Sequence, residues 1–368
     1  MQHILDPDIR TLDGWVKQQG LPTFRAAQIR HWLYGSQVDS FSAMTNLPTA
    51  LREQLAAQFQ WWTTRIAAHQ KADDGTEKLL LDLADGKRIE CVLLRDGQRR
   101  TICISTQVGC AMGCVFCASG LDGVDRNLTS GEIIEQMLRL GRLLPDDERL
   151  SHIVVMGMGE PLANLANLLP ALKLASQQEG LGISPRRITI STVGLPAAMH
   201  RLVDSGVAYN LAVSLHAAND ALRDQLVPVN AKAGLTAILT AADAYFHASG
   251  RRLTYEYVLL GGLNDRRCDA LELAEILGGR PALLNLIPYN PVAGLPYMTP
   301  TQASVQAFCS LLEQRGINIQ IRRRKGSRID AACGQLRRSR AGISKTSEPN
   351  LVSPSVTKPR DRTSPESH

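Results

Sequence analysis

The order of hydrophobic and polar positions divides the first third of the chain into two patterns. Up to about residue 70, apolar residues recur at helical spacing, as in the stretch "FRAAQIRHWLYG" at 24–35, and this predicts a compact helical region. From about 76 to 106, short apolar runs are separated by Asp-Gly dipeptides at 85–86 and 96–97, which are typical of tight hairpin turns. We therefore expect helices followed by β-hairpins.

Beyond residue 106, apolar runs and amphipathic stretches alternate. The apolar runs suit buried parallel strands and occupy residues 152–159, 186–192, 209–217, 252–260 and 282–290. Between them lie helical stretches, one of which opens on Thr129-x-x-Glu132, the form of a capping box. Repeated strand–helix units imply right-handed crossovers, and therefore an open parallel sheet or a barrel. Active residues are then expected at the carboxyl ends of the strands.

The composition places the chain among ordinary globular proteins. It has 368 residues, 44% hydrophobic and 21% charged, which suits one large domain with an accessory part. No run of 18 apolar residues occurs, and acids stand where a signal peptide would need a basic flank, so we expect a cytoplasmic protein without a membrane span. In that compartment, clustered cysteines are more often metal-binding or catalytic than disulfide-bonded.

The positive charge is concentrated in one segment. The chain carries a net charge of +6, while residues 322–340 hold eight Lys and Arg residues and one acid, a net +7. This segment indicates either an anionic partner or a basic solvated stretch leading into a tail. The tail itself, residues 337–368, is rich in Ser, Pro and Thr with few large apolar residues, so we expect it to be disordered.

Three of the eight cysteines, Cys110, Cys114 and Cys117, stand close together in the pattern C-x3-C-x2-C, just after a predicted strand. A structural zinc site needs a second pair of ligands, and the remaining cysteines (Cys91, Cys103, Cys268, Cys309 and Cys333) are isolated. An iron–sulfur cube has four irons to ligate, so three thiolates leave one iron open to an exchangeable ligand. The alternative is three unrelated buried thiols.

The cysteine loop, with Phe116 before its last cysteine, resembles the signature of the radical S-adenosylmethionine (SAM) enzymes. The resemblance implies a [4Fe-4S] cluster held by the three cysteines, with SAM on the fourth iron. Reductive cleavage of SAM there yields a 5′-deoxyadenosyl radical. The stretch "GMGEP" at 157–161 is similar to the motif that contacts the methionine amino group, which makes Gly159 and Glu160 candidate SAM ligands. Further candidates are polar or adjacent positions at strand ends: Ser191, Ser214, Leu215, His216 and Asn290.

Three further motifs resemble the RlmN/Cfr family of RNA methyltransferases. They are "CISTQVGCAMGCVFCASG", the pair "SLHAAND" and "NLIPYNPVAGLPY", and "RIDAACGQL" after the basic run. The resemblance spans about residues 20–337. It implies an α/β fold, a partial (β/α)6 radical SAM barrel with a small helical N-terminal accessory domain and a β-hairpin extension. The corresponding ranges are 1–75 for the accessory domain, 76–106 for the extension, 96–336 for the core barrel and 337–368 for the tail.

The same resemblance assigns roles to three isolated residues. Cys333 takes a methyl group from one SAM and becomes S-methylcysteine, and a second SAM supplies the radical that activates this methyl group. Glu90 is the proton acceptor, and Cys103 forms a transient disulfide with Cys333 that releases the product. Such chemistry suits carbon 2 of adenine, which lies between two electron-withdrawing nitrogens and does not attack a sulfonium methyl.

The family implies methylation of C2 of an adenosine in 23S rRNA, and of the adenosine 3′ to the anticodon in tRNAs. It also implies an external electron donor such as flavodoxin or ferredoxin, and we expect a monomer. Methylation of adenine C8, as in the Cfr group, remains an alternative because the same catalytic residues serve it. An RNA-binding protein with a structural or redox-sensing cluster is an alternative of another class.

Overall fold

The computed structural model describes residues 1–6, 9–322, 325–326 and 329–337. Within these residues, one sheet of ten strands runs in the order β14-β13-β12-β11-β10-β9-β6-β5-β4-β3. Its strands are β3 (Arg65–Lys71), β4 (Glu77–Asp82), β5 (Arg88–Asp96), β6 (Arg99–Cys103), β9 (His152–Val155), β10 (Ile188–Thr192), β11 (Asn210–Ser214), β12 (Leu253–Leu259), β13 (Ala282–Pro288) and β14 (Ile319–Ile321).

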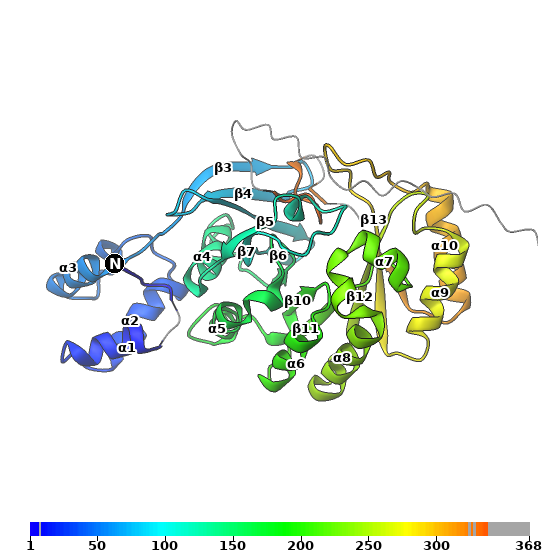
Figure 1. The fold of residues 1–368 in the computed structure, drawn as a ribbon. Coiled ribbons are helices and arrows are strands. Elements are labelled where there is room, and N and C mark those ends of the chain that lie inside the picture. Colours follow the sequence, from blue (N-terminus) through cyan, green and yellow to red (C-terminus); the bar gives the residue numbers. More distant parts are fainter. Residues whose placement is uncertain (7–8, 323–324, 327–328, 338–368) are drawn as a thin grey trace, which may run out of the picture.

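From β6 to β14, all neighbouring strands are parallel. The successive crossovers contain α4 (Ser130–Gly141), α5 (Leu165–Ser176), α6 (Pro196–Asp204), α7 (Asp220–Leu226), α8 (Gly234–Ser249), α9 (Arg267–Leu277) and α10 (Gln302–Gln314). Figure 1 shows the helices on the outer side of a curved sheet. The sheet does not close, because β3 and β14 are its edges among the described residues. The predicted partial barrel is therefore confirmed.

Helix α4 begins where the sequence predicts. The hydroxyl of Thr129 accepts a hydrogen bond from the Glu132 backbone, and the Glu132 carboxylate accepts one from the Thr129 backbone. This reciprocal pair satisfies two amide groups that the first turn of a helix leaves without partners.

The hairpin extension consists of β3, β4 and β5, which pair antiparallel with one another and join the parallel strands through β6. The turns after β4 and β5 contain Gly86 and Gly97, both with positive φ, as the Asp-Gly dipeptides predict. Strand β3 corrects the prediction of helix up to about residue 70. It is an edge strand with mostly exposed side chains, so its sequence lacks the alternation that marks a half-buried strand.

The N-terminal part contains α1 (Ile9–Gln18), α2 (Phe24–Arg30), a π-helical turn at His31–Gly35, a 3-10 turn at Phe41–Ala43 and α3 (Thr49–Gln58). The short strands β1 (Gln2–His3) and β2 (Phe59–Gln60) pair in parallel and tie its two ends together. Figure 1 shows this part projecting from the barrel beside α4.

A small antiparallel pair, β7 (Gln107–Gly109) and β8 (Val124–Asn127), brackets the cysteine loop. Short 3-10 turns lie at Ala118–Gly120, Pro161–Asn164, Pro185–Arg187 and Pro228–Lys232. Across the described part of the chain, every helix is too short or too polar to span a membrane. Residues 338–368 of the predicted tail (337–368) lie outside the described residues. So do five arginines of the basic segment: Arg323, Arg324, Arg328, Arg338 and Arg340.

Candidate active site

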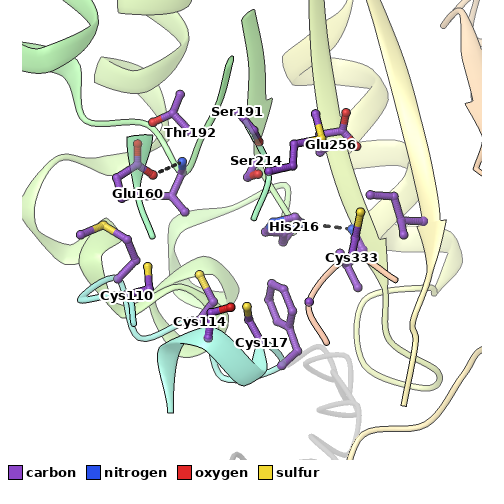
Figure 2. A pocket seen from close by; sticks show the side chains of 18 of the residues that line it. Cys110, Cys114, Cys117, Glu160, Ser191, Thr192, Ser214, His216, Glu256 and Cys333 are labelled. Atoms are coloured by element: carbon purple, nitrogen blue, oxygen red, sulfur yellow. Dashed lines mark hydrogen bonds between the residues drawn. The ribbon is translucent and has the colours of Figure 1, made fainter. Parts of the chain in front are cut away.

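A cavity opens at the carboxyl ends of the parallel strands, where the strand–helix pattern predicts active residues. Its volume is about 930 Å³ including the open mouth, within the range of small-molecule sites. Most of the predicted site residues line this cavity (Figure 2). They are the predicted cluster ligands Cys110, Cys114 and Cys117, the predicted SAM ligands Gly159, Glu160, Ser191, Ser214, His216 and Asn290, and the predicted reactive thiol of Cys333.

The cysteine loop forms one wall of this cavity. Its start is held by a hydrogen bond from the Cys110 amide to Gly123 O (2.8 Å), and a local turn joins the Cys117 amide to Cys114 O (3.1 Å). The ring of Phe116 packs edge-on against His216, with ring centroids 4.9 Å apart. Figure 2 shows the three sulfur atoms on the same side of the loop, facing the cavity.

The three thiols fit an iron–sulfur cube better than a single ion. In the described residues, no three His, Cys, Asp or Glu side chains are close enough to ligate one metal ion. A cube takes each cysteine on a different iron, so its three sulfurs lie farther apart than the ligands of one ion. Burial raises the pKa of Cys114 and Cys117, and that of Cys110 to about 12. Iron would reverse this effect, because a bound cation favours the thiolate.

Glu160 lies in the glycine-containing loop after β9 and is buried. Its two carboxylate oxygens accept hydrogen bonds from the amides of Leu162 and Val193, each 3.0 Å long. Burial raises the pKa of Glu160, and these amide donors counteract the shift. The side chain is therefore fixed in one orientation at the cavity wall.

The end of β11 is shaped by a sharp backbone turn at His216, whose φ is +63°. Its Nδ1 accepts a hydrogen bond from the Val258 amide (3.1 Å), and burial lowers the pKa of His216 to about 3. The ring is therefore neutral at physiological pH. Leu215, predicted as a SAM residue, is not among the cavity-lining residues; its carbonyl accepts a hydrogen bond from buried Arg223.

The segment around Cys333 is attached to the cavity from two sides. The side chain of Asn290, at the end of β13, donates to Cys333 O (3.2 Å), and Gln335 donates to Pro291 O (3.0 Å). From the cysteine loop, the Ala118 amide donates to Gly334 O (2.8 Å). These bonds bring Cys333 to the predicted cluster ligands, although more than two hundred residues separate them in the sequence.

Glu90 and Cys103 lie beside the cavity rather than on its lining. Glu90 is buried, forms an ion pair with Lys78 (2.8 Å) and accepts a hydrogen bond from the Arg337 amide (2.9 Å). Cys103 ends β6, and burial raises its pKa to about 12, with the charge of nearby Cys333 adding to the shift. The structure therefore brings both residues to the Cys333 segment. Glu90 is therefore not a solvent-facing acid, although it lies in a hairpin strand.

Several cavity residues were not singled out from the sequence, among them Thr192, Glu256 and Arg322. Glu256 carried a usable signal, because it is the one charged residue in the apolar strand "LTYEYVL". Arg322 was noted only as part of the basic run. Arg223 was also missed: it is fully buried and donates to the carbonyls of Val193, Ser214 and Leu215, which links the ends of β10 and β11.

An open parallel barrel with three cysteines in the loop after its first strand, facing polar residues at the other strand ends, defines the class of radical SAM proteins. Residues 104–274 match the family described as the Radical SAM superfamily. Residues 2–60 match a second family, described as the ribosomal RNA large subunit methyltransferase N-terminal domain.

Curated relatives identify the particular family. A probable dual-specificity RNA methyltransferase RlmN of Rhodopirellula baltica is 61% identical over 344 residues, covering 94% of this chain and 93% of the relative. One of Symbiobacterium thermophilum, described in the same words, is 47% identical and covers 86% of each chain. The crystal structure of a radical SAM methyltransferase from Sphaerobacter thermophilus is 40% identical, covers 92% of this chain and 99% of its own, and superposes with a TM-score of 0.89. The chain belongs to the RlmN family of radical SAM RNA methyltransferases.

Proposed function

We propose that the protein methylates C2 of an adenosine in 23S rRNA and of the adenosine 3′ to the anticodon in tRNAs, through S-methylation of Cys333. The observation that carries the proposal is the meeting of Cys333 with the Cys110, Cys114 and Cys117 triad at one cavity. A separate N-terminal part that matches an RNA methyltransferase domain supports RNA as the substrate.

Cys110, Cys114 and Cys117 are the residues that would hold a [4Fe-4S] cluster. When bound, the cluster supplies the electron that cleaves SAM. Glu160, Ser191, Ser214, His216 and Asn290 would bind SAM beside it. Asn290 supports this assignment, because its Oδ1 is buried and has no hydrogen-bond partner within the described structure. We also propose that an external protein such as flavodoxin or ferredoxin donates the electrons, and that the protein acts as a monomer.

Two SAM molecules serve one turnover. The sulfur of Cys333 attacks the methyl group of the first, displaces S-adenosylhomocysteine and loses its proton, which leaves S-methylcysteine. The radical from the second SAM abstracts a hydrogen atom from this S-methyl group. The methylene radical that results adds to C2 of the adenine and forms a covalent adduct. Glu90 then accepts the proton from the base, and the adduct gives up one electron, which the cluster, when bound, would accept. The sulfur of Cys103 attacks that of Cys333, and the bond between the Cys333 sulfur and the transferred carbon breaks. This carbon takes up a proton, so a disulfide forms as the methylated base leaves. The hydrogen bond from the Arg337 amide to Glu90 supports this arrangement, because it ties the base to the Cys333 segment.

Methylation at C8 would use the same residues, and a mass analysis of digested RNA separates 2-methyladenosine from 8-methyladenosine. The close relatives named RlmN favour C2. An RNA-binding protein with a structural cluster would not need Cys103 and Cys333 near the cavity.

The test is anaerobic reconstitution with iron and sulfide, followed by methylation of protein-free rRNA and tRNA with labelled SAM. We expect 2-methyladenosine from the native sequence and none from Cys333→Ala. Cys103→Ala should remain covalently bound to RNA, because the adduct forms but is not released. Cys268→Ala, at an exposed position of α9, is the control and should retain full activity. A fully active Cys333→Ala variant would refute the proposal.

A further inference from the structure

Glu256 occupies an unusual position on the inner face of the barrel. It lies within β12, in register with Ser214 of β11 and Asn285 of β13, and it lines the cavity. Val258 is two residues nearer the carboxyl end of the strand and also lines the cavity. Because strands rise about 3.3 Å per residue, Glu256 is deeper in the barrel than Val258 by about 7 Å. The carboxylate therefore belongs to the cavity floor.

Only one of its two oxygens is satisfied. Oε1 accepts a hydrogen bond from the Asn285 side chain (2.9 Å), whereas Oε2 is buried without any hydrogen-bond partner in the described structure. The nearest cation is Arg322, whose Nη1 is 3.9 Å from Oε2, too far for a hydrogen bond. The other carboxylate in the cavity, Glu160, has donors on both oxygens.

An unsatisfied buried carboxylate oxygen is costly, because it has lost water and gained no donor in exchange. Burial raises the pKa of Glu256, and the charge of Arg322 only partly offsets this shift. The side chain is 5% exposed, so bulk water does not provide the missing donor. A ligand that enters the cavity and carries a hydrogen-bond donor would complete the site.

The chemistry of the cavity indicates which ligand this is. Under the proposed function, on which this inference rests, both molecules that enter are adenosines: SAM and the target nucleotide. Adenosine offers donors in its exocyclic amino group and its ribose hydroxyls. We propose that Glu256 is a substrate-orienting residue whose free oxygen accepts a hydrogen bond either from the adenosine of SAM or from the exocyclic amino group of the target adenine.

The surroundings of Glu256 favour an adenosine over a simple cation. The floor offers one carboxylate with Arg322 next to it, and the cation neutralises the attraction for a second positive charge. Apolar side chains of Val155, Val258 and Ile287 also line the cavity, and they suit the faces of a base. A neutral, planar group with a donor at its edge matches both features.

The two adenosines can be separated by experiment on the cluster-loaded protein with Glu256→Gln. The first measurement is the equilibrium affinity for SAM. The second compares binding of a target RNA with the same RNA carrying purine riboside, which lacks the amino group, at the target position. Loss of a hydrogen bond to a charged acceptor should weaken binding about tenfold or more. Thr254→Val, on the same face of β12 but not among the cavity-lining residues, is the matched control.

Weaker SAM affinity in Glu256→Gln, with the discrimination between the two RNAs unchanged, would assign the bond to SAM. Unchanged SAM affinity, with the discrimination lost, would assign it to the target adenine. If the variant folds like the native protein, as judged by its thermal unfolding, and both measurements match those of Thr254→Val, the inference is wrong. The measurement of SAM affinity does not require turnover, so it tests the role of Glu256 independently of methylation. A native protein that binds SAM but methylates no RNA would refute the proposed function, and the SAM measurement on Glu256→Gln could still be interpreted.

Discussion

At the scale of single residues, the site depends on charged groups that the fold removes from water and then pairs. Lys78 and Glu90 face each other at 2.8 Å, and their side chains are only 6% and 7% exposed. Lys78 also donates to Asp330 O (3.2 Å), three residues before Cys333. One lysine therefore fixes both the proposed proton acceptor and the segment that carries the proposed reactive thiol.

Replacing Lys78 with Met should destabilise the protein by about 3 kcal/mol, because Glu90 would remain as a buried charge without its partner. Denaturant unfolding measures the change. Lys78→Arg keeps the charge and should lose much less stability. Equal stability of the Met variant and the native protein would show that the ion pair contributes nothing.

A second residue-scale prediction concerns pH. Burial is the main cause that lowers the pKa of His3 from its ordinary value of 6.5. Below pH 6.5 the unfolded chain therefore binds more protons at this residue than the folded chain, so the contribution of His3 to stability decreases as the pH falls. Unfolding free energies at pH 7.5 and 5.5 should differ less in His3→Asn than in the native protein. His200→Asn, at an exposed position, should behave like the native protein.

At the scale of elements, the loop after β9 needs glycine for close packing. A Cβ on Gly159 would lie 2.6 Å from the Cβ of Gln107, and the φ of Gly159 is +100°. Gln107 in turn accepts a hydrogen bond from the Glu160 amide (2.8 Å). The loop and β7 are therefore packed so closely that we expect a side chain at position 159 to displace Glu160.

Gly159→Ala should lower the free energy of unfolding by about 2 kcal/mol, because a non-glycine residue is strained at this φ and its Cβ would collide with Gln107. The same collision should displace Glu160 and so weaken SAM binding to the cluster-loaded protein. Gly182→Ala separates the two effects: its φ is +63°, yet a Cβ there would meet no atom within 4 Å. This control should lose some stability and keep its SAM affinity. Equilibrium dialysis with labelled SAM provides the comparison.

The hairpin extension holds the C-terminal segment in place through several hydrogen bonds. Lys325 donates to Arg95 O and to Asp96, both 2.8 Å away, and the Gly326 amide donates to Asp74 (2.8 Å). With the bond from Lys78 to Asp330 O, these contacts hold the approach to Cys333 against β4, β5 and the turn before β4. Figure 1 shows the C-terminal segment beside these strands.

At the scale of the whole molecule, the N-terminal part is attached to the barrel through Glu135 of α4. This fully buried carboxylate accepts hydrogen bonds from the amides and hydroxyls of Thr63 and Thr64, between 2.5 and 3.0 Å long. Burial opposes ionisation, but these donors and nearby His3 hold the pKa of Glu135 below its usual range. The residues between the helices and the sheet are thereby fixed to the barrel.

Glu135→Gln should loosen this attachment, because an amide group cannot accept on both sides, and we expect about 3 kcal/mol lower stability. Limited proteolysis should cut faster at residues 59–64, while SAM affinity is retained. Glu148→Gln, which removes an ion pair with Arg100 near the surface, is the control and should leave the cleavage rate unchanged. Unchanged proteolysis of both variants would contradict the role of Glu135.

The sequence predicted the parallel strands, the two Asp-Gly hairpins and the Thr129 capping box, because each depends on local periodicity or turn chemistry. It did not predict β3, whose exposed residues carry no alternation, nor the pairing of β1 with β2, which are separated by more than fifty residues. Among site residues, motif resemblance pointed to the cysteines and Glu160. It did not point to Glu256, whose proposed role rests on a buried oxygen without a hydrogen-bond partner, a feature that exists only in the folded chain.

By itself, the sequence determined the class of chemistry, since the C-x3-C-x2-C spacing and the isolated Cys103 and Cys333 are properties of the chain. Only the tertiary structure decided which groups face one another: Lys78 and Glu90 with the Cys333 segment, and Glu256 with the cavity. The physical reason is that motifs and periodicities are local along the chain. Burial, ion pairing and hydrogen bonding instead depend on contacts between residues that the fold brings together from distant positions.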